Sequence, residues 1–286
     1  MRPIWFRNPS VRRSTVRFSL VYLLLIVAAS PVVAQDPTPT PNRPMLELLL
    51  QAAEAQIMPE ATAVPAPPYS IVNALVNGDI PYGRGEDGAF TIGDPDAPIT
   101  IIEFADWSCP HCQTYRATID QLLQSYVLAG LAQFEFRMFP TAGGQQTAAL
   151  GVIAECAALN TEADEGAGLG FWRAYEALYV MAENDEYFAE NVLINLSDRL
   201  EMDAEALLEC AQGIEVPQVA VDLQLAVDIG LTGTPGVLVR YPDAAVDEIA
   251  FIELDGVTYN RGGVPLTVLD SVITAANDMP PFMTNP

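Results

Sequence analysis

The chain has 286 residues, 50% of them hydrophobic, which is enough to bury one core of about 150 to 200 residues with extensions around it. Its formal charge is −24; five of the 13 basic residues and none of the acidic ones lie within positions 1–34, so the remainder carries 8 basic and 37 acidic residues, or −29. This acidity argues against nucleic acid and anionic membrane surfaces as partners and is typical of a well-solvated surface.

The first 34 residues have the pattern of an export signal. Five arginines precede an apolar run over residues 18–29, and small residues lead to Ala34. These are the n-region, h-region and cleavage site of a signal peptide, so we predict cleavage after Ala34. An uncleaved anchor is the alternative, because residues 18–34 are just long enough to span a membrane. Either way the folded part lies outside the cytoplasm, in a periplasm or on the outer face of the membrane, where disulfides persist.

Residues 35–89 are predicted to be a linker, because prolines recur along them and favour extended spacers. Within this linker, residues 45–58 carry polar side chains on one helical face and leucines on the other, as in a short amphipathic helix. That helix could dock on its own domain, on a partner or on a second copy. The folded domain is predicted over residues 90–279, followed by a tail at 280–286.

The domain is predicted to begin near Phe90, with a turn-rich lead over residues 91–98. Residues 99–104 are apolar and β-branched, which is typical of a strand buried on both faces. A helix over residues 110–129 and an alternating strand over residues 133–139 follow.

A helical block is predicted next, over residues 145–213. A helix over residues 217–229 follows, with Gly230 as its stop signal. Strands at residues 236–240 and 249–254 and a last helix at residues 265–276 complete the domain. This order predicts an α/β protein: a thioredoxin fold with an inserted helical subdomain.

Two cysteines three positions apart lie where the first strand gives way to its helix, and they enclose the chain's one histidine. Cys109 falls at the helix N-terminus, where exposed N–H groups and the macrodipole favour a thiolate, and Pro110 suits the first helical turn. His111 adds a positive or donating neighbour. The pattern predicts Cys109 as the exposed attacking thiolate and Cys112, one turn inside, as the resolving thiol.

Metal binding and a purely structural disulfide are alternative interpretations of this pair. A structural zinc site needs a second pair of ligands, whereas the chain has one histidine, and Cys156 and Cys210 lie far away in sequence. A structural bridge in the turn before a helix is equally disfavoured. We therefore predict no metal site, and no cofactor other than a redox-active Cys109–Cys112 disulfide.

The residues around this pair resemble those of a known family. Residues 104–112 read Phe-Ala-Asp-Trp-Ser-Cys-Pro-His-Cys, and Gly-Thr-Pro follows at residues 233–235. This combination resembles the DsbA-like thiol:disulfide oxidoreductases of the thioredoxin superfamily. The resemblance covers residues 90–276, because the motif, the helical insertion and the Gly-Thr-Pro occur in the order found in that family.

The resemblance implies roles for four further residues. Pro235 would follow a cis peptide bond and face the redox pair, and the backbone of Thr234 would pair with an extended substrate; an ordinary trans proline is the alternative. Glu103 would be a buried carboxylate that shuttles the proton of the resolving thiol, although a strand-end glutamate facing solvent fits the pattern almost as well. Trp107 resembles the aromatic residue that precedes the redox pair near the substrate, and packing is the alternative that we favour.

The remaining cysteines, Cys156 and Cys210, both fall on predicted helices of the insertion. Related exported members resemble this chain in carrying a second, structural bridge there, and an oxidising compartment with an even cysteine count favours pairing. Closing a loop of about 55 residues would stabilise the fold by about 4 kcal/mol in the chain-entropy model. Two buried free thiols are the alternative.

The resemblance implies an exported thiol oxidase whose partners are reduced or unfolded exported proteins. A quinone-linked membrane protein would reoxidise it, and the central Pro-His dipeptide, as in the oxidant members, favours oxidation. Two other hypotheses remain open: a reductase or isomerase, in which electrons flow the other way, and a non-enzymatic module that holds extended peptides beside Thr234 and Pro235.

Overall fold

The computed structural model describes residues 70–278, apart from positions 79, 166, 167 and 243. The predicted signal, the helix over residues 45–58 and the tail at 280–286 lie outside the described residues. Within the described ranges, none of the helices combines the length and the apolar character needed to cross a membrane.

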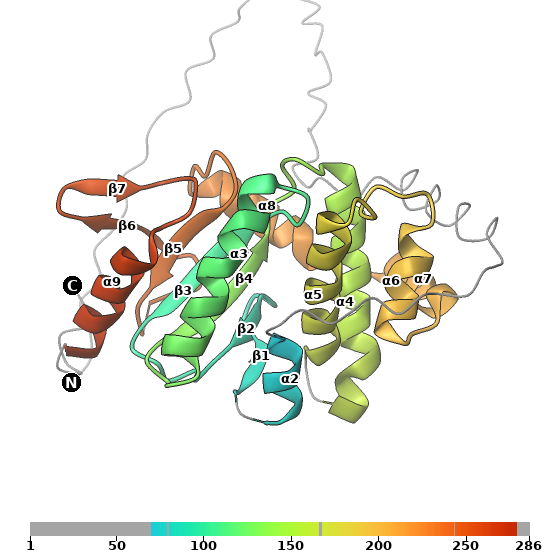
Figure 1. The fold of residues 1–286 in the computed structure, drawn as a ribbon, viewed down its shortest axis with the longest axis horizontal. Coiled ribbons are helices and arrows are strands. Elements are labelled where there is room, and N and C mark those ends of the chain that lie inside the picture. Colours follow the sequence, from blue (N-terminus) through green and yellow to red (C-terminus); the bar gives the residue numbers. More distant parts are fainter. Residues whose placement is uncertain (1–69, 79, 166–167, 243, 279–286) are drawn as a thin grey trace, which may run out of the picture. The chain divides into compact units, whose positions relative to one another are not determined.

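The described residues form one mixed sheet with the order β1-β2-β4-β3-β5-β6-β7 (Figure 1). The central strand β3 is parallel to β4 and antiparallel to β5, and its neighbours on both sides keep it buried, as its apolar run predicts. The strands are β1 (Tyr82–Arg84), β2 (Phe90–Ile92), β3 (Thr100–Ala105), β4 (Gln133–Met138), β5 (Gly236–Arg240), β6 (Ala250–Leu254) and β7 (Val257–Tyr259).

Helices cover both faces of this sheet. The helices are α2 (Ile71–Val76), α3 (Pro110–Leu122) with a π-helical turn η1 (Leu123–Val127), α4 (Gln145–Glu165), α5 (Leu169–Glu183), α6 (Val192–Leu200), α7 (Ala204–Gly213), α8 (Gln218–Asp228) and α9 (Leu266–Asp278). Helices α3 and α9 pack against each other on one face (Figure 1). On the other face, Ala226 of α8 packs with Ile102 and Phe104 of β3.

Helices α4 to α7 are inserted between β4 and α8, with bounds that agree with the predicted block at residues 145–213. Helix α4 packs against α5, α7 and α8, and α5 contacts α3. The insertion therefore closes the same core that the sheet and α3 build, which confirms a thioredoxin fold with a helical insertion.

The folded region begins before Phe90, which differs from the predicted linker boundary. Ile71, Leu75 and Ile80 are buried in the main core, and β1 pairs with β2. Glu176 of α5 accepts hydrogen bonds from the amides of Ile71 at 2.5 Å and Val72 at 3.3 Å. Ser70 caps this six-residue helix through the Asn73 amide, at 3.3 Å, and Glu176 adds further acceptors from about a hundred positions away. A helix this short is marginal without such tertiary partners, so its local sequence does not show its packing face.

Three short strands and one helix end also differ from the sequence prediction. Strand β2 lies in what we predicted as a turn-rich lead, and β1 and β7 have three residues each, too few to show an alternating pattern. The helix that begins at Pro110 ends as an α-helix at Leu122 and continues through η1 rather than running regularly to 129.

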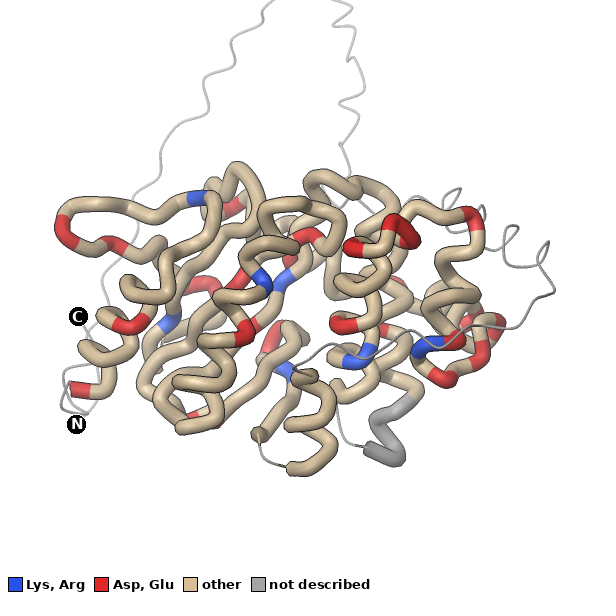
Figure 2. The backbone as a smooth tube through the Cα atoms, viewed as in Figure 1, with Lys and Arg blue, Asp and Glu red and all other residues tan. Residues whose placement is uncertain are grey.

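Strand β4 carries charges that are buried rather than solvated. The Arg137 guanidinium pairs with Glu135 at 2.7 Å, Asp87 at 2.6 Å and Asp222 at 3.1 Å, and Arg240 also contacts Glu135, at 2.5 Å. Burial raises the pKa of Asp222 to about 7. Elsewhere acidic residues are spread along the chain, several of them on α6 and α7 (Figure 2).

Candidate functional site

Cys109 lies in the short connection between β3 and α3. Its backbone caps α3, with an extended conformation at φ −73° and ψ 119°, and Pro110 occupies the first helical turn. The Gln113 amide donates to the Cys109 carbonyl at 3.0 Å, which closes the first turn. The amides of that turn have no partner within the helix and lie at the same end of α3 as the Cys109 sulfur.

The two thiols differ in accessibility. Both are unbonded, Cys109 is 6% exposed and Cys112 is 0% exposed. The prediction of an exposed Cys109 is wrong, because the surrounding loop covers most of its surface, although Cys109 is the less buried of the two thiols. The exposed neighbours Pro110 and His111 flank its small open area.

The Thr234–Pro235 segment lies against Cys109. Its peptide bond is cis, the isomer that the family resemblance implies. The Cys109 thiol donates to the Thr234 carbonyl, with 3.6 Å between Sγ and O. The Pro235 carbonyl accepts from the amides of Gly262 at 2.9 Å and Gly263 at 3.1 Å, which ties this segment to the loop before α9. The fold thus brings together residues 125 positions apart.

Glu103 is buried in β3, at 1% exposure, so the solvent-facing alternative is wrong. Neither of its carboxyl oxygens has a hydrogen-bond partner among the described residues. Burial raises its pKa to about 8, although the nearby Arg116 guanidinium acts in the opposite direction. Burial also raises the pKa of the Cys112 thiol, and the negative charge of Glu103 raises it further. The two groups therefore influence each other's protonation, which suits a proton exchange between them.

Trp107 does not line a substrate surface. Its side chain is 0% exposed and its ring packs on Phe136, with 5.8 Å between centroids. The assignment of Trp107 to substrate binding is wrong, and the packing alternative is confirmed. An aromatic residue beside a redox pair looks the same in sequence whether it points inward or outward, so the pattern could not decide.

Asp106 is a site residue that the sequence analysis did not single out. It is 0% exposed and lies between Glu103 and the redox pair, at the end of β3. Its carboxylate accepts hydrogen bonds from Ser108, Thr141, Gly143 and Thr147. The signal in the sequence was an acidic residue directly after an apolar strand, where an unpaired buried charge would be costly.

Arg116 is a second residue that the sequence analysis missed. Its guanidinium carbon lies 4.7 Å from the ring centre of Tyr175 and 5.1 Å from that of Tyr179, both on α5. Its Nε contacts Asp120 at 2.9 Å. The available signal was its position one helical turn after Cys112, which places it on the buried side of α3.

The comparisons with known proteins agree with this geometry. Residues 86–241 match the protein family described as Thioredoxin. The chain belongs to this family. A probable disulfide bond formation protein D of Bacillus anthracis is 29% identical over 156 residues, which cover 52% of this chain and 69% of that protein. Its counterpart in Bacillus cereus is 28% identical over 156 residues, which again cover 52% of this chain and 69% of that protein.

A solved structure shows the same fold. The crystal structure of alpha-DsbA1 from Wolbachia pipientis has a TM-score of 0.51 and 20% identity, and the match covers 68% of this chain and 92% of that one. This likeness shows the fold, and the family match and the curated relatives support a DsbA-like thiol:disulfide oxidoreductase of the thioredoxin superfamily.

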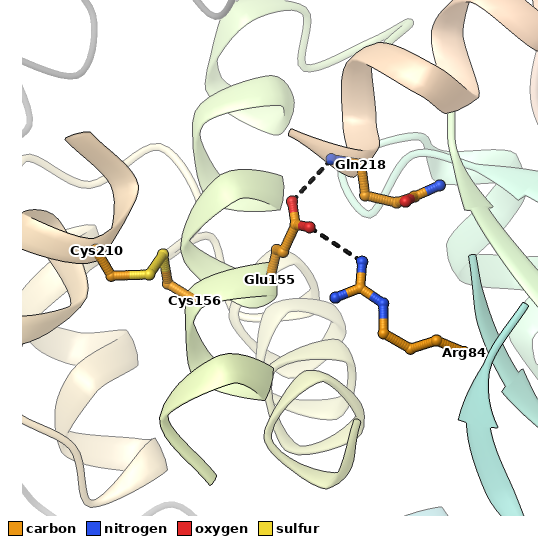
Figure 3. Close-up of a disulfide and its surroundings, with 5 residues drawn as sticks. All are labelled: Arg84, Glu155, Cys156, Cys210 and Gln218. Atoms are coloured by element: carbon orange, nitrogen blue, oxygen red, sulfur yellow. Dashed lines mark hydrogen bonds and ion pairs between the residues drawn. A yellow bond between two sulfur atoms is a disulfide. The ribbon is translucent and has the colours of Figure 1, made fainter. Parts of the chain in front are cut away.

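The second cysteine pair of this thioredoxin-family chain is bonded and lies in the insertion. A disulfide joins Cys156 of α4 to Cys210 of α7, 54 positions apart (Figure 3). The adjacent Glu155 points the other way, contacting Arg84 of β1 at 3.0 Å and the Gln218 amide at the start of α8 at 2.7 Å. This region of α4 therefore links α7, β1 and α8.

The described residues show no metal site. No group of three or more His, Cys, Asp or Glu side chains in this part of the chain is arranged to hold a metal ion. His111 in particular lies on the exposed side of the helix start, beside the redox pair.

Proposed function

We propose that this protein oxidises cysteine pairs in exported proteins through a Cys109–Cys112 disulfide. The observation that carries the proposal is the position of the Cys109 sulfur, at the N-terminus of α3 and 3.6 Å from the carbonyl oxygen of Thr234. The Pro-His dipeptide between the two cysteines, as in the oxidant members of the family that the sequence resembles, favours oxidation over reduction. The names of the Bacillus relatives, disulfide bond formation proteins, point to the same chemistry.

The reaction balances as a two-electron exchange. A substrate thiolate attacks the Cys109 sulfur, the Cys109–Cys112 bond breaks and Cys112 leaves as a thiolate. Glu103, with a pKa of about 8, is protonated at neutral pH and supplies the proton that this thiolate takes up. A second thiolate of the same substrate then attacks the substrate sulfur of the mixed disulfide. This attack releases Cys109 as a thiolate. The substrate gains a disulfide, and the enzyme is left reduced.

The protein works outside the cytoplasm in this proposal, delivered there by the signal at residues 1–34, either cleaved after Ala34 or retained as an anchor. Its substrates are proteins with reduced cysteines. Regeneration of the Cys109–Cys112 disulfide needs an electron acceptor, which we assign to a quinone-linked membrane partner. No other cofactor is required, because the disulfide itself carries the two electrons.

Equilibration of the purified protein in glutathione buffers tests the direction of electron flow. The Cys109–Cys112 couple is quantified by mass spectrometry of alkylated peptides, while Cys156 and Cys210 are followed separately. A potential well above about −270 mV supports the oxidase, whereas a value near or below it fits a reductase. A Cys109→Ser, Cys112→Ser variant that still oxidises peptides would refute the proposal, whereas a wild-type protein that binds extended peptides without oxidising them would favour a peptide-binding module.

A further inference from the structure

The buried carboxylate of Asp106 joins the redox loop to the start of α4. Its Oδ1 accepts hydrogen bonds from the Ser108 amide at 3.0 Å, the Ser108 hydroxyl at 2.9 Å and the Thr147 hydroxyl at 2.7 Å. The Thr147 hydroxyl also lies 2.8 Å from that of Tyr187. Two of these three hydrogen bonds come from Ser108, so this oxygen fixes the residue directly before Cys109.

The other oxygen of Asp106 holds the loop between β4 and α4, residues 139–144. Its Oδ2 accepts from the backbone amides of Thr141 at 2.8 Å and Gly143 at 2.9 Å. Gly143 approaches so closely that an added Cβ would clash with the hydroxyl oxygens of Thr147 and Ser108. One carboxylate therefore sets the position of two chain segments that border the redox pair, and only glycine fits between them.

Thr141 extends this arrangement to the Thr234–Pro235 segment. Its hydroxyl lies 2.6 Å from the hydroxyl of Thr234, 93 positions away in sequence. Thr141 is exposed and Thr234 is half-buried, so this bond lies at the rim of the site, where it adds little to the core. The carbonyl oxygen of Thr234 also accepts a hydrogen bond from the Cys109 thiol, with 3.6 Å between O and Sγ. The Asp106 carboxylate and the Thr141 hydroxyl thus connect the loop of residues 139–144 to the segment beside the reactive sulfur.

We propose that Thr141 is a positioning residue for peptide recognition, and this inference rests on the proposed function. Its hydroxyl, held in place by Asp106 through the Thr141 amide, fixes the side chain of Thr234. The Thr234 backbone is then presented to an extended cysteine-containing peptide in one conformation. The ligand class is a polypeptide that pairs through its main chain, not a small thiol, because the positioned element is backbone.

The test compares two thiols and two substitutions. Thr141→Val keeps the shape of the side chain and removes the hydroxyl, whereas Thr141→Ser keeps the hydroxyl. Oxidised wild type and variants are mixed with a cysteine-containing heptapeptide and, separately, with dithiothreitol, which has no peptide backbone. Rates of Cys109–Cys112 reduction are followed by stopped-flow fluorescence, and thermal unfolding shows that each variant is folded.

The Thr141→Val substitution is expected to lower the second-order rate with the peptide by about threefold to tenfold, the effect of losing one hydrogen bond. Its rate with dithiothreitol should fall by less than about twofold, and Thr141→Ser should restore the peptide rate. Equal losses with both thiols, or no loss with the peptide, would overturn the positioning role. A wild-type protein that oxidises neither thiol would instead overturn the proposed function.

Discussion

Cys109 and Cys112 lie three positions apart at the start of a helix, whereas Cys156 and Cys210 join two helices 54 positions apart. The first pair has the N-terminus of α3, the Thr234 carbonyl and the buried Glu103 around it. The second pair lies among helices of the insertion, with Cys156 fully buried. The same side chain therefore serves exchange in one place and cross-linking in the other.

This difference teaches that the surroundings, and not the thiol itself, decide the use of a cysteine. A redox thiol needs an open path for a second sulfur and a nearby group that can exchange a proton with the departing thiolate. A structural bridge needs only geometry, and its contribution grows with the length of the chain segment that it closes. Each of these requirements can be removed by substitution, so the difference between the two pairs can be tested one feature at a time.

The largest effect is expected when a substitution in the redox pair is compared with substitutions in the structural pair. Cys109→Ala should lower the rate of thiol–disulfide exchange by about a thousandfold or more, because no other sulfur can take the substrate, and should change the unfolding free energy by only about 1 kcal/mol. The Cys156→Ala, Cys210→Ala variant should show the opposite pattern. It should keep the exchange rate within about twofold and lose about 2 to 4 kcal/mol of stability.

Stopped-flow rates with a cysteine peptide and urea unfolding measure the two quantities on the same samples. The double variant serves as the control for Cys109→Ala, since it removes more sulfur and leaves the redox site unchanged. If Cys109→Ala lost mainly stability, or if the double variant lost mainly its exchange rate, the division of roles between the pairs would be contradicted.

Much of the fold could be predicted because long periodic segments determine it. The apolar run before the redox pair gave β3, Pro110 marked the start of α3, and Gly230 marked the end of α8 within two residues. The bounds of the helical block agreed because its apolar residues recur at helical spacing over many turns. The spacing of Cys109 and Cys112 marked the redox pair, whereas the pairing of Cys156 with Cys210 rested on the family resemblance and the even cysteine count.

The remainder depends on partners that lie far apart in the chain. Helix α2 has only six residues and depends on Glu176 in addition to its own Ser70 cap, and Thr141 meets Thr234 across 93 positions. The role of Asp106 arises from amides of a loop that no local pattern connects to it. The inward direction of Trp107 was likewise set by Phe136 on the neighbouring strand. Such contacts are properties of the folded chain and leave no periodic trace in sequence.

The Glu103 carboxyl beside the redox pair should make the free energy of unfolding depend on pH. Its pKa rises from 4.5 to about 8 on folding because it is buried, so the stabilisation is complete below pH 4.5 and is lost as pH rises towards 8. Glu103→Gln has no charge to bury. The free energy of unfolding of this variant, taken relative to wild type at the same pH, should therefore rise by about 3 kcal/mol between pH 5 and pH 8.

Urea unfolding of both proteins at pH 5, 6, 7 and 8 gives this difference. Asp222, whose pKa burial also raises, to about 7, titrates in both proteins and cancels in the comparison. A constant difference between Glu103→Gln and wild type across the four pH values would mean that Glu103 is not the titrating group and would remove it from the proton exchange with Cys112.

The smallest effect is expected beside the second pair, at Glu155. Its carboxylate contacts Arg84 at 3.0 Å and the Gln218 amide at 2.7 Å, with the ion-paired side chains 20% and 10% exposed. In Glu155→Gln the amide oxygen can still accept from the Gln218 amide, whereas the NH2 group opposes Arg84, so the loss should be about 1 kcal/mol. This variant should keep the Cys109–Cys112 potential of wild type. A shift in that potential would show that the insertion influences the redox pair and does not merely support it.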